Sequence, residues 1–491
     1  MSAAVLRPAS PWKLLAVLAL LSFWPGFAAP SHAAVPPAER KALLGLYSGT
    51  GGARWVNRES WGRPAGSECD WYGVRCNEAR TTVEEIFLAD NGLTGKLPAK
   101  LGNLPNLRTL DLESNALTGA LPKDLGRLRN LRDLRLGLNQ LSGPLPRDLG
   151  NLANLQTLSL SFNKLSGAIP ADLGRLANLQ VLDLSRNLLT GALPLQLGNL
   201  RSLQYLDLSA NRLTGAIPID LGRLTGLVSL YLGGNQLTGD IPKALGSLAV
   251  LEQLGLSDNQ LTGRIPPELG RLSRLAYLDL ERNQLSGLIP AKLGSATSLQ
   301  GLLLTGNRLS GNIPGALGNL ESLALLWLGA NRLTGPVPLE LGNLADLLEN
   351  AGLDLRGNAL ATDPEAGLLI FLNEKQVGGK WIASQVPAAP FEFGTALGSL
   401  ADRRSGGWVY WRIDLAAGAP ALKISTAGGT GEVDLYVRFG ARPTAEQSDA
   451  ASAKAGNVET VTITGAKAGT YYIGLRAGAP YTGVTLKVGG S

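Results

Sequence analysis

The residues that could carry out chemistry are few, and their types exclude most familiar catalytic sites. The 491-residue sequence contains one histidine, His32, and two cysteines, Cys69 and Cys76. His32 lies in a segment that we expect to be removed on export. Ser-His-Asp and Cys-His catalysis and His-ligated metals are therefore excluded for the mature chain. Two cysteines are too few for a zinc or iron–sulfur cluster and suit one disulfide.

Acidic residues are the remaining candidates for catalysis or metal binding. Asp183 and Asp207 would lie near 5 Å apart on adjacent strands, roughly the carboxylate separation of retaining glycosidases. An open, solvated sheet gives no reason for one carboxyl group to stay protonated, so glycoside hydrolysis is our weakest hypothesis. Asp434 is a candidate calcium ligand, although a lone aspartate beside a glycine-rich turn is usually a turn cap. We expect no other cofactor.

Aromatic residues are better candidates, and for binding rather than catalysis. Rings with a polar group suit sugar rings or peptide anchors. Aspartate and serine are also common defaults at such outward positions, so a plain solvated surface is the alternative. The predicted ligand-binding residues are Tyr205, Asp207, Tyr231, Tyr277, Asp279 and Trp327.

These side chains must be positioned by an internal repeat, which dominates the sequence. Asparagines recur every 24 residues, each followed by glycine four residues later and proline seven residues later. Leucines precede each asparagine at fixed offsets, as do Leu107, Leu110 and Leu112 before Asn115. The repeated asparagines are Asn91, Asn115, Asn139, Asn163, Asn187, Asn211, Asn235, Asn259, Asn283, Asn307 and Asn331.

The offsets indicate how one repeat folds. The Leu-x-Leu pair has the period of a strand, so both leucines point inward and their neighbours point out from a parallel sheet. A buried asparagine must satisfy its amide, and stacked copies can bond the backbone of the bend and of the next coil as a ladder. Glycine and proline shape the return path. We therefore expect the outward face of this concave sheet to carry the function.

The repeat, Leu-x-x-Asn-x-Leu-x-Gly-x-Ile/Leu-Pro-x-x-Leu-Gly, resembles plant-type leucine-rich repeats, as found in receptor-kinase ectodomains and polygalacturonase-inhibiting proteins. The preceding segment, with Trp55, Trp61 and the run from Cys69 to Cys76, is similar to the N-terminal cap of that class. The resemblance implies an α/β horseshoe solenoid. The cap would be stapled by a disulfide, in keeping with export.

The period breaks after Asn331, because the next matching asparagine, Asn358, comes 27 residues later. The stretch 368–375, continuing through Trp381 and Gln385, predicts a short amphipathic helix with an aromatic plug. It is similar to the closing segment of bacterial leucine-rich repeat proteins. Pro387 and Pro390 then mark a linker.

The last hundred residues alternate β-rich runs with glycine-rich turns, which favours a small all-β sandwich or jelly roll. We expect strands at 408–411, 422–424, 433–439, 458–463, 471–475 and 484–488. The runs 434–437, 456–459 and 468–473 resemble the bacterial pre-peptidase C-terminal domain. That family accompanies secreted hydrolases, is thought to hold them on substrates or to be removed after secretion, and implies a bacterial protein. No protease precedes it here.

The N-terminal residues indicate export. Arg7 and Lys13 precede an apolar run, Leu14 to Phe23, and a small-residue cleavage site at 31–33. The formal net charge is +6, of which these two residues supply two charges, so no nucleic-acid partner is expected. The predicted parts are a signal peptide (1–33), an N-terminal cap (34–82), about twelve repeats (83–361), a C-terminal cap (362–386), a linker (387–393) and the β-sandwich (394–491).

The leading functional hypothesis is a non-catalytic exported recognition protein that binds a protein, peptide or polysaccharide on the concave face. The β-sandwich would aid adhesion or secretion. The alternative is a proteinaceous inhibitor of a secreted glycanase or other hydrolase, and a passive spacer would show similar repeats. We expect a monomer without a transmembrane anchor, located outside the cell, on its surface or in the periplasm.

Overall fold

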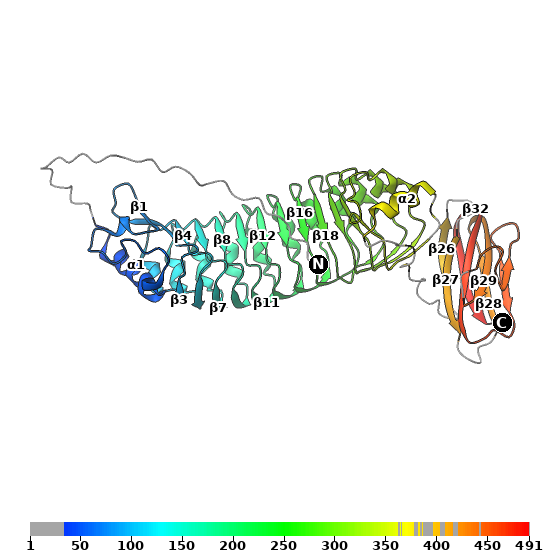
Figure 1. Ribbon diagram of the computed structural model, residues 1–491, viewed down its shortest axis with the longest axis horizontal. Helices are drawn as coiled ribbons and strands as arrows, with labels where there is room; N and C mark the ends of the chain where they lie inside the picture. Colours follow the sequence, from blue (N-terminus) through cyan, green and yellow to red (C-terminus); the bar gives the residue numbers. More distant parts are fainter. Residues whose placement is uncertain are drawn as a thin grey trace.

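The computed structural model describes two folded parts of the chain, a solenoid and a smaller β domain. The described residues are 34–361, 364, 366–377, 382, 385, 396–402, 408–415, 421–440 and 443–490. The predicted signal peptide (1–33), the predicted linker (387–393) and Trp381 lie outside the described residues. Figure 1 shows the coils of the solenoid in blue to yellow and the β domain in orange and red.

Each coil of the solenoid contributes one short strand to a 13-stranded first sheet. β1 is antiparallel to β2, whereas the following neighbours are parallel and in the same register, with Asp183 beside Asp207 and Asp207 beside Tyr231. The strands are β1 (Val74–Cys76), β2 (Val83–Phe87), β4 (Thr109–Asp111), β6 (Asp133–Arg135), β8 (Thr157–Ser159), β10 (Val181–Asp183), β12 (Tyr205–Asp207), β14 (Ser229–Tyr231), β16 (Gln253–Gly255), β18 (Tyr277–Asp279), β20 (Gly301–Leu303), β22 (Leu325–Trp327) and β24 (Leu353–Asp354).

A second row of short parallel strands follows on each coil, and our sequence analysis did not predict it. It forms an eight-stranded and a four-stranded sheet, and Figure 1 shows it as a row separate from the first sheet. The strands are β3 (Thr94–Lys96), β5 (Ala116–Gly119), β7 (Gln140–Pro144), β9 (Lys164–Ala168), β11 (Leu188–Ala192), β13 (Arg212–Ala216), β15 (Gln236–Asp240), β17 (Gln260–Thr262), β19 (Ser286–Gly287), β21 (Arg308–Gly311), β23 (Arg332–Gly335) and β25 (Ala359–Leu360).

In the coils before β24, a 3-10 helix follows directly after the repeated proline. Pro122 has φ of −65° and ends an extended segment where η4 begins. A Cβ on Gly126 in η4 would lie 2.3 Å from the carbonyl oxygen of Asp148 on the next coil, so close stacking of coils requires glycine there. The helices are η3 (Ala99–Asn103), η4 (Lys123–Arg127), η5 (Arg147–Asn151), η6 (Ala171–Arg175), η7 (Leu195–Asn199), η8 (Ile219–Arg223), η9 (Lys243–Ser247), η10 (Pro267–Arg271), η11 (Ala291–Ser295), η12 (Gly315–Asn319) and η13 (Leu339–Asn343).

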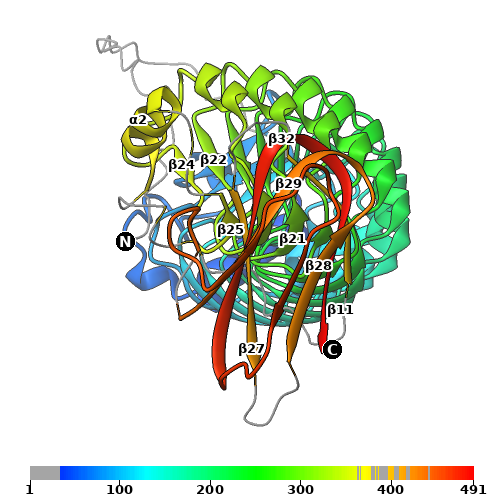
Figure 2. The ribbon, with the colours of Figure 1, turned by 90° about the vertical axis from the view of Figure 1, so that its right-hand side faces the viewer.

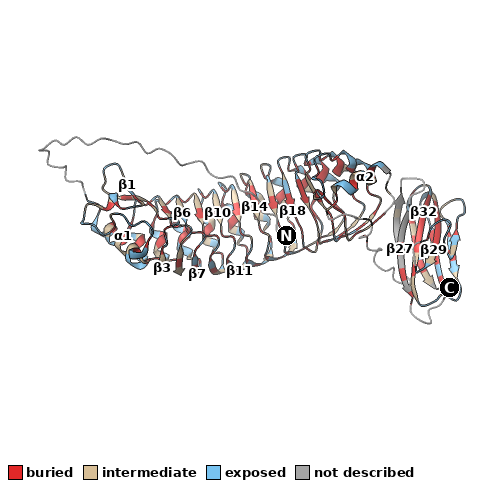
Figure 3. Ribbon diagram, viewed as in Figure 1, coloured by how far each residue is buried: buried red, intermediate tan, exposed pale blue. Residues whose placement is uncertain are grey.

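One continuous core runs through the coils, and the repeated leucines and asparagines build it (Figure 3). Leu182 and Leu184 are fully buried, as their strand period predicts. Asn187 Oδ1 accepts a hydrogen bond from the backbone N–H of Leu165 on the preceding coil, at 2.9 Å. Its Nδ2 donates to the carbonyl oxygens of Leu160, Leu184 and Ser185 at 3.0 to 3.1 Å. The amide therefore ties the bend of its own coil to the coil before it.

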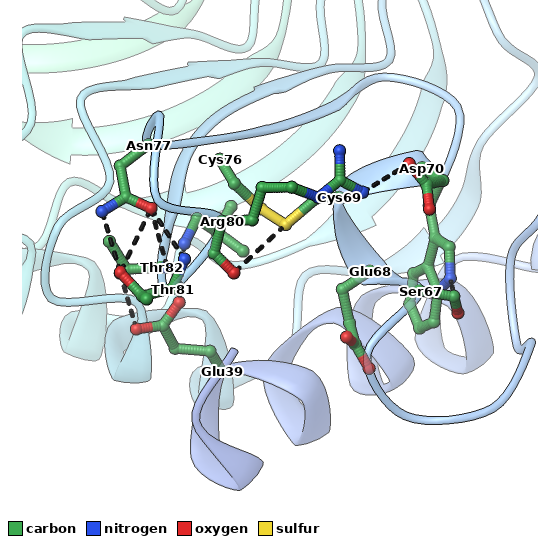
Figure 4. Close-up of a disulfide and its surroundings, with 12 residues drawn as sticks. Glu39, Ser67, Glu68, Cys69, Asp70, Cys76, Asn77, Arg80, Thr81 and Thr82 are labelled. Carbon is green, nitrogen blue, oxygen red and sulfur yellow. Dashed lines mark hydrogen bonds and ion pairs between the residues drawn. A yellow bond between two sulfur atoms is a disulfide. The ribbon is translucent and has the colours of Figure 1, made fainter. Parts of the chain in front are cut away.

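The N-terminal cap closes the solenoid with α1 (Pro37–Gly49), η1 (Gly52–Arg54), η2 (Glu68–Asp70) and a disulfide between Cys69 and Cys76 (Figure 4). Glu39 is 2% exposed, and its carboxylate accepts from Thr82 Oγ1 at 2.8 Å and from the Val83 N–H at 2.7 Å. These bonds tie α1 to the start of β2. Four aromatic side chains pack around this cap: Tyr47, Trp55, Trp61 and Trp71.

At the other end of the solenoid, glutamines take over the role of the repeated asparagine. Gln385 stands 27 residues after Asn358, the same interval as between Asn331 and Asn358. Its Oε1 accepts from the Leu360 N–H at 3.1 Å and its Nε2 donates to the Leu355 carbonyl at 3.0 Å. The predicted closing helix is α2 (Ala366–Lys375). The longer glutamine thus continues the hydrogen-bond ladder beyond the last repeated asparagine, Asn358.

The C-terminal domain is antiparallel and nearly closed (Figure 2). Two runs that we predicted as separate strands, 471–475 and 484–488, belong to one long strand, β32. Its first half pairs with β27 and β29 and its second half with β26 and β28, so one bent strand joins the two sides. The strands are β26 (Ala396–Asp402), β27 (Trp408–Leu415), β28 (Leu422–Ala427), β29 (Thr430–Phe439), β30 (Ala450–Ser452), β31 (Thr460–Ile463) and β32 (Gly469–Gly490).

Candidate functional site

A groove of about 720 Å³ lies on the outward face of the first sheet, across the strands β4 to β14. The groove lies at this position because side-chain size differs from one coil to the next. Small residues, Thr157 and Ser159, stand on the middle coil, whereas larger side chains stand on the coils to either side. The groove is therefore a trough between two rows of longer side chains. It is lined by Glu113, Arg135, Thr157, Ser159, Val181, Asp183, Tyr205, Asp207, Ser209 and Tyr231.

Asp207 is held by hydrogen bonds from its own strand. Its Oδ1 accepts from the Ser209 N–H at 2.9 Å and from Ser209 Oγ at 2.6 Å. Its Oδ2 accepts from the Tyr205 hydroxyl at 3.2 Å. Burial raises the pKa of Asp207 above its ordinary 3.8, with a smaller contribution from the neighbouring Asp183 charge, while the Ser209 bonds oppose the rise. The burial of Asp207 corrects our expectation that this face is fully solvated. Asp207 nevertheless accepts these hydrogen bonds, as an ionised carboxylate does.

Two tyrosines form the wall at the C-terminal side of the groove. The ring centroids of Tyr205 and Tyr231 lie 5.9 Å apart, with the planes tilted by 58°. Tyr231 occupies the space above Gly255 on the next strand, because a Cβ there would come within 2.9 Å of its Cδ1. Burial raises the pKa of both phenols, so both hydroxyls are protonated at neutral pH.

The carboxylates of Asp183 and Asp207 lie side by side without a counter-ion. They are register partners on β10 and β12, and among the described residues neither makes an ion pair. Asp183 Oδ1 accepts from the Ser185 N–H and Oγ at 3.0 and 2.7 Å. The nearby Arg135 is engaged with Asp133 at 3.3 Å. The groove thus presents uncompensated negative charge beside aromatic rings.

The other predicted binding residues do not reach this groove. Tyr277 and Asp279 lie on β18, two strands beyond β14. Tyr277 fills the space above Gly301, and Asp279 accepts from Ser257 Oγ at 2.6 Å. Trp327 donates from Nε1 to the Ala351 carbonyl at 2.9 Å, so its polar group is used within the solenoid. Only Tyr205, Asp207 and Tyr231 of the predicted set come together.

Two kinds of residue near the groove were missed by the sequence analysis. Glu113 and Ser209 stand two positions before the repeated asparagine, and this row also faces outward. Leu138 and Phe162 stand one position before it and are 45% and 43% exposed. The sequence contains a signal for Leu138 and Phe162, because other repeats carry small or polar residues, such as Ser114, directly before the repeated asparagine.

The candidate metal ligand Asp434 lies in the C-terminal domain, on β29 opposite Arg476 of β32. It is 8% exposed, and burial raises its pKa above the ordinary value. Within the described part of the chain, no group of three or more His, Cys, Asp or Glu side chains could hold a metal ion. A calcium role for Asp434 therefore has no further support beyond its residue type.

Family models match both folded parts. Leucine-rich repeat models match residues 88–189, 201–261, 274–296 and 298–320. A model of the bacterial pre-peptidase C-terminal domain matches residues 409–477. Both resemblances predicted from the sequence are thereby confirmed.

Solved structures with the same solenoid fold include plant receptor ectodomains. The plant peptide hormone receptor RGFR1 in complex with RGF2 is 38% identical, with a TM-score of 0.55, over 56% of this chain and 44% of that one. The Arabidopsis receptor kinase HAESA, in complex with the peptide hormone IDA and the co-receptor SERK1, is 33% identical. Its TM-score is 0.54, over 66% of this chain and 58% of that one.

Curated relatives match a much shorter stretch. An extracellular protease of Xanthomonas campestris is 37% identical over 83 residues, which is 17% of this chain and 14% of the relative. The chain spans less than a third of the proteases that it matches, and they match only the region of the C-terminal domain. The chain therefore contains leucine-rich repeats like those of plant receptor ectodomains, followed by a bacterial pre-peptidase C-terminal domain.

Proposed function

We propose that the protein is a non-catalytic recognition protein whose solenoid binds an extended ligand in the groove of the first sheet. The observation that carries this proposal is the groove itself, which is lined by Tyr205, Tyr231 and two carboxylates that make no ion pair with the described residues. Ligand sites are concave and combine apolar or aromatic walls with a few placed polar groups.

A peptide or protein segment is the favoured ligand class. Two structures that share the solenoid fold are receptors in complex with peptide hormones. The groove crosses several coils, and an extended segment can contact one coil after another along such a trough.

We infer a separate role for the C-terminal domain, in secretion or adhesion outside the cell. Its relatives include a protein named as an extracellular protease, and the predicted signal peptide agrees with export. No helix within the described ranges has the length and apolar character needed to cross a membrane. Removal of residues 394–491 is expected to leave groove binding intact and to change the amount of protein retained at the cell surface or released.

The proposed function is tested by ligand selection with matched tyrosine variants. Binders are selected from a displayed random peptide library and from an array of plant and bacterial polysaccharides. The Tyr205→Ala/Tyr231→Ala double variant is expected to weaken the selected binder about 30-fold or more, because aromatic anchors dominate such interfaces. The control is Tyr277→Ala, which removes an exposed tyrosine from the same sheet outside the groove and should leave the Kd unchanged.

The proposal would be contradicted if the double variant and the Tyr277→Ala control lost affinity equally, or if neither lost affinity. A binder that proves to be a secreted glycanase, losing activity in a 1:1 complex, would place the protein among hydrolase inhibitors. Calorimetry and circular dichroism of each variant establish that the solenoid remains folded.

A further inference from the structure

Two exposed apolar residues next to the groove are not explained by the fold. Leu138 and Phe162 occupy the same position on adjacent coils, with φ of 54° and 53°. This left-handed conformation disfavours bulky side chains and suits glycine, which stands at the equivalent positions Gly234 and Gly306. Neither residue gains burial in return, since both are more than 40% exposed. A leucine and a phenylalanine at these positions are unfavourable for two reasons. The backbone conformation disfavours bulky side chains, and the apolar side chains are exposed to water.

The position of this pair points to the ligand. Each residue follows a strand that contributes to the groove, because Leu138 comes after β6 and Phe162 after β8. The Arg186 guanidinium lies 4.8 Å from the centroid of the Phe162 ring and supports one of its faces. We name Leu138 and Phe162 the apolar rim. Its two residues do not line the groove itself, but each follows directly after a strand that does.

The carboxylates that line the groove beside the apolar rim favour a positively charged ligand. Asp183 and Asp207 lie on the two strands after β8, and no described side chain forms an ion pair with either. Asp183 Oδ2 makes no hydrogen bond in the described structure, so it is available as an acceptor. The Tyr205 and Tyr231 rings on the same wall can stack on a guanidinium or ammonium group.

We propose that groove and rim together bind an extended peptide segment with one cationic and one apolar side chain. The cation, best an arginine, lies between the two carboxylates and the two tyrosines, and the apolar side chain packs against Leu138 and Phe162. This inference rests on the proposed function and names its ligand class. Neutral polysaccharides supply neither group, and polyuronates carry the wrong charge.

The geometry also sets the spacing of the two side chains. Strands of one sheet are about 4.8 Å apart, and Phe162 lies three residues beyond the end of β8, so the two subsites are at most roughly 11 Å apart. An extended peptide advances about 3.3 Å per residue. The cationic and apolar residues are therefore expected no more than about four positions apart in the bound segment.

The test is selection from a displayed random 12-residue peptide library on the full protein and four variants. On the wild type, selected peptides should share an Arg or Lys and a Leu, Phe or Ile at this spacing. Asp183→Asn/Asp207→Asn should remove the basic residue from the selected set, and Leu138→Ser/Phe162→Ser should remove the apolar one. Matched controls are Asp279→Asn on the same sheet and Leu195→Ser/Ile219→Ser, which changes exposed apolar residues of η7 and η8.

A selected peptide is then titrated against each variant. Each groove or rim variant should weaken its Kd about tenfold or more, and each control less than about twofold. Replacing the peptide arginine with citrulline should reproduce the effect of the aspartate variant. Because these residues are exposed or carry no core contacts, all variants should keep the wild-type circular dichroism spectrum.

The possible failures are distinguishable. Peptides that require Tyr205 and Tyr231 but contain neither a basic nor an apolar consensus residue would overturn this inference and leave the proposed function intact. Polysaccharide binding that survives Asp183→Asn/Asp207→Asn would do the same. Absence of any binder that depends on the two tyrosines would overturn both.

Discussion

The two halves of the first-sheet face share one repeat but differ in what their side chains leave open. On β6 to β14, small residues such as Thr157 and Ser159 stand between longer side chains and leave a trough. On β18 to β22, Trp327 is bonded to the Ala351 carbonyl. Tyr277 fills the space above Gly301, and within the described part of the chain no ring contact of Tyr277 is found.

The charges of the two halves differ in the same way. Asp183 and Asp207 line the groove, and neither makes an ion pair with any residue that the structure describes. In the later half, Arg282 pairs with Asp258, and its charge counteracts the effect of burial on the pKa of Asp279. Under the proposed function, a repeat face becomes a binding site where side-chain size leaves a trough beside carboxylates that have no ion-pair partner among the described residues. Three changes would break or sharpen this comparison.

The largest effect should come from the framework, and it should be the same in both halves. Asn187→Ala and Asn283→Ala each remove one acceptor and three donor bonds. Each is expected to cost about 3 kcal/mol of unfolding free energy, because buried backbone groups lose their partners. Urea unfolding followed by circular dichroism measures the loss. A cost below about 1 kcal/mol in either variant would refute the ladder as a shared support.

A smaller effect should separate the halves through two glycines. Gly255→Ala would place a Cβ within 2.9 Å of Tyr231 Cδ1, and Gly301→Ala would place one within 2.7 Å of Tyr277 Cδ1. Both variants displace a tyrosine ring, yet only Gly255→Ala alters the groove wall. Ligand Kd should rise about three- to tenfold for Gly255→Ala and stay unchanged for Gly301→Ala. Similar effects of the two substitutions on titration would show that the halves are equivalent.

The smallest effect is a dependence of stability on pH. Burial raises the pKa of Asp207 and of Asp279 above the ordinary 3.8. Each group therefore adds stability that is fully present below pH 3.8 and lost as pH rises through its folded-state pKa. Asp207→Asn and Asp279→Asn should each stabilise the solenoid at pH 7, by less than about 1 kcal/mol. Urea midpoints at pH 7 and 3.5 measure this, and the gain should vanish at the lower pH.

Ligand binding should distinguish Asp207 from Asp279, whereas their substitutions are expected to have the same effect on stability. Asp207→Asn should weaken a cationic ligand, whereas Asp279→Asn should not, since only Asp207 lines the groove. A stability gain that persists at pH 3.5 would show that the gain does not come from removing an ionised carboxylate.

Much of the solenoid could be predicted from the sequence, because its contacts repeat with the period of the chain. The 24-residue spacing places Tyr205, Asp207 and Tyr231 on one outward face, and the structure brings them together. Gln385 shows where such prediction ends. It stands at the interval of the next asparagine but has a different side chain, and only its bonds to Leu355 and Leu360 reveal that it continues the ladder.

The binding features away from the repeat consensus could not be predicted in the same way. Leu138 and Phe162 are visible as apolar residues in the sequence, but their exposure depends on a left-handed backbone that points them away from the core. Likewise, the sequence analysis grouped Trp327 with the tyrosines, because outward strand positions were its only criterion. The hydrogen bond to Ala351 comes from a chain segment 24 residues away.

The sequence alone thus determined the coil, its buried leucines and asparagines, the cap cysteines and the order of the two folded parts. These depend on local period and residue type, which one coil repeats to the next. The tertiary structure decided which outward residues line the groove that we propose as the binding site. A trough, an unpaired charge and an exposed rim are properties of neighbouring coils together, since they depend on the sizes and partners of side chains that adjacent strands bring side by side.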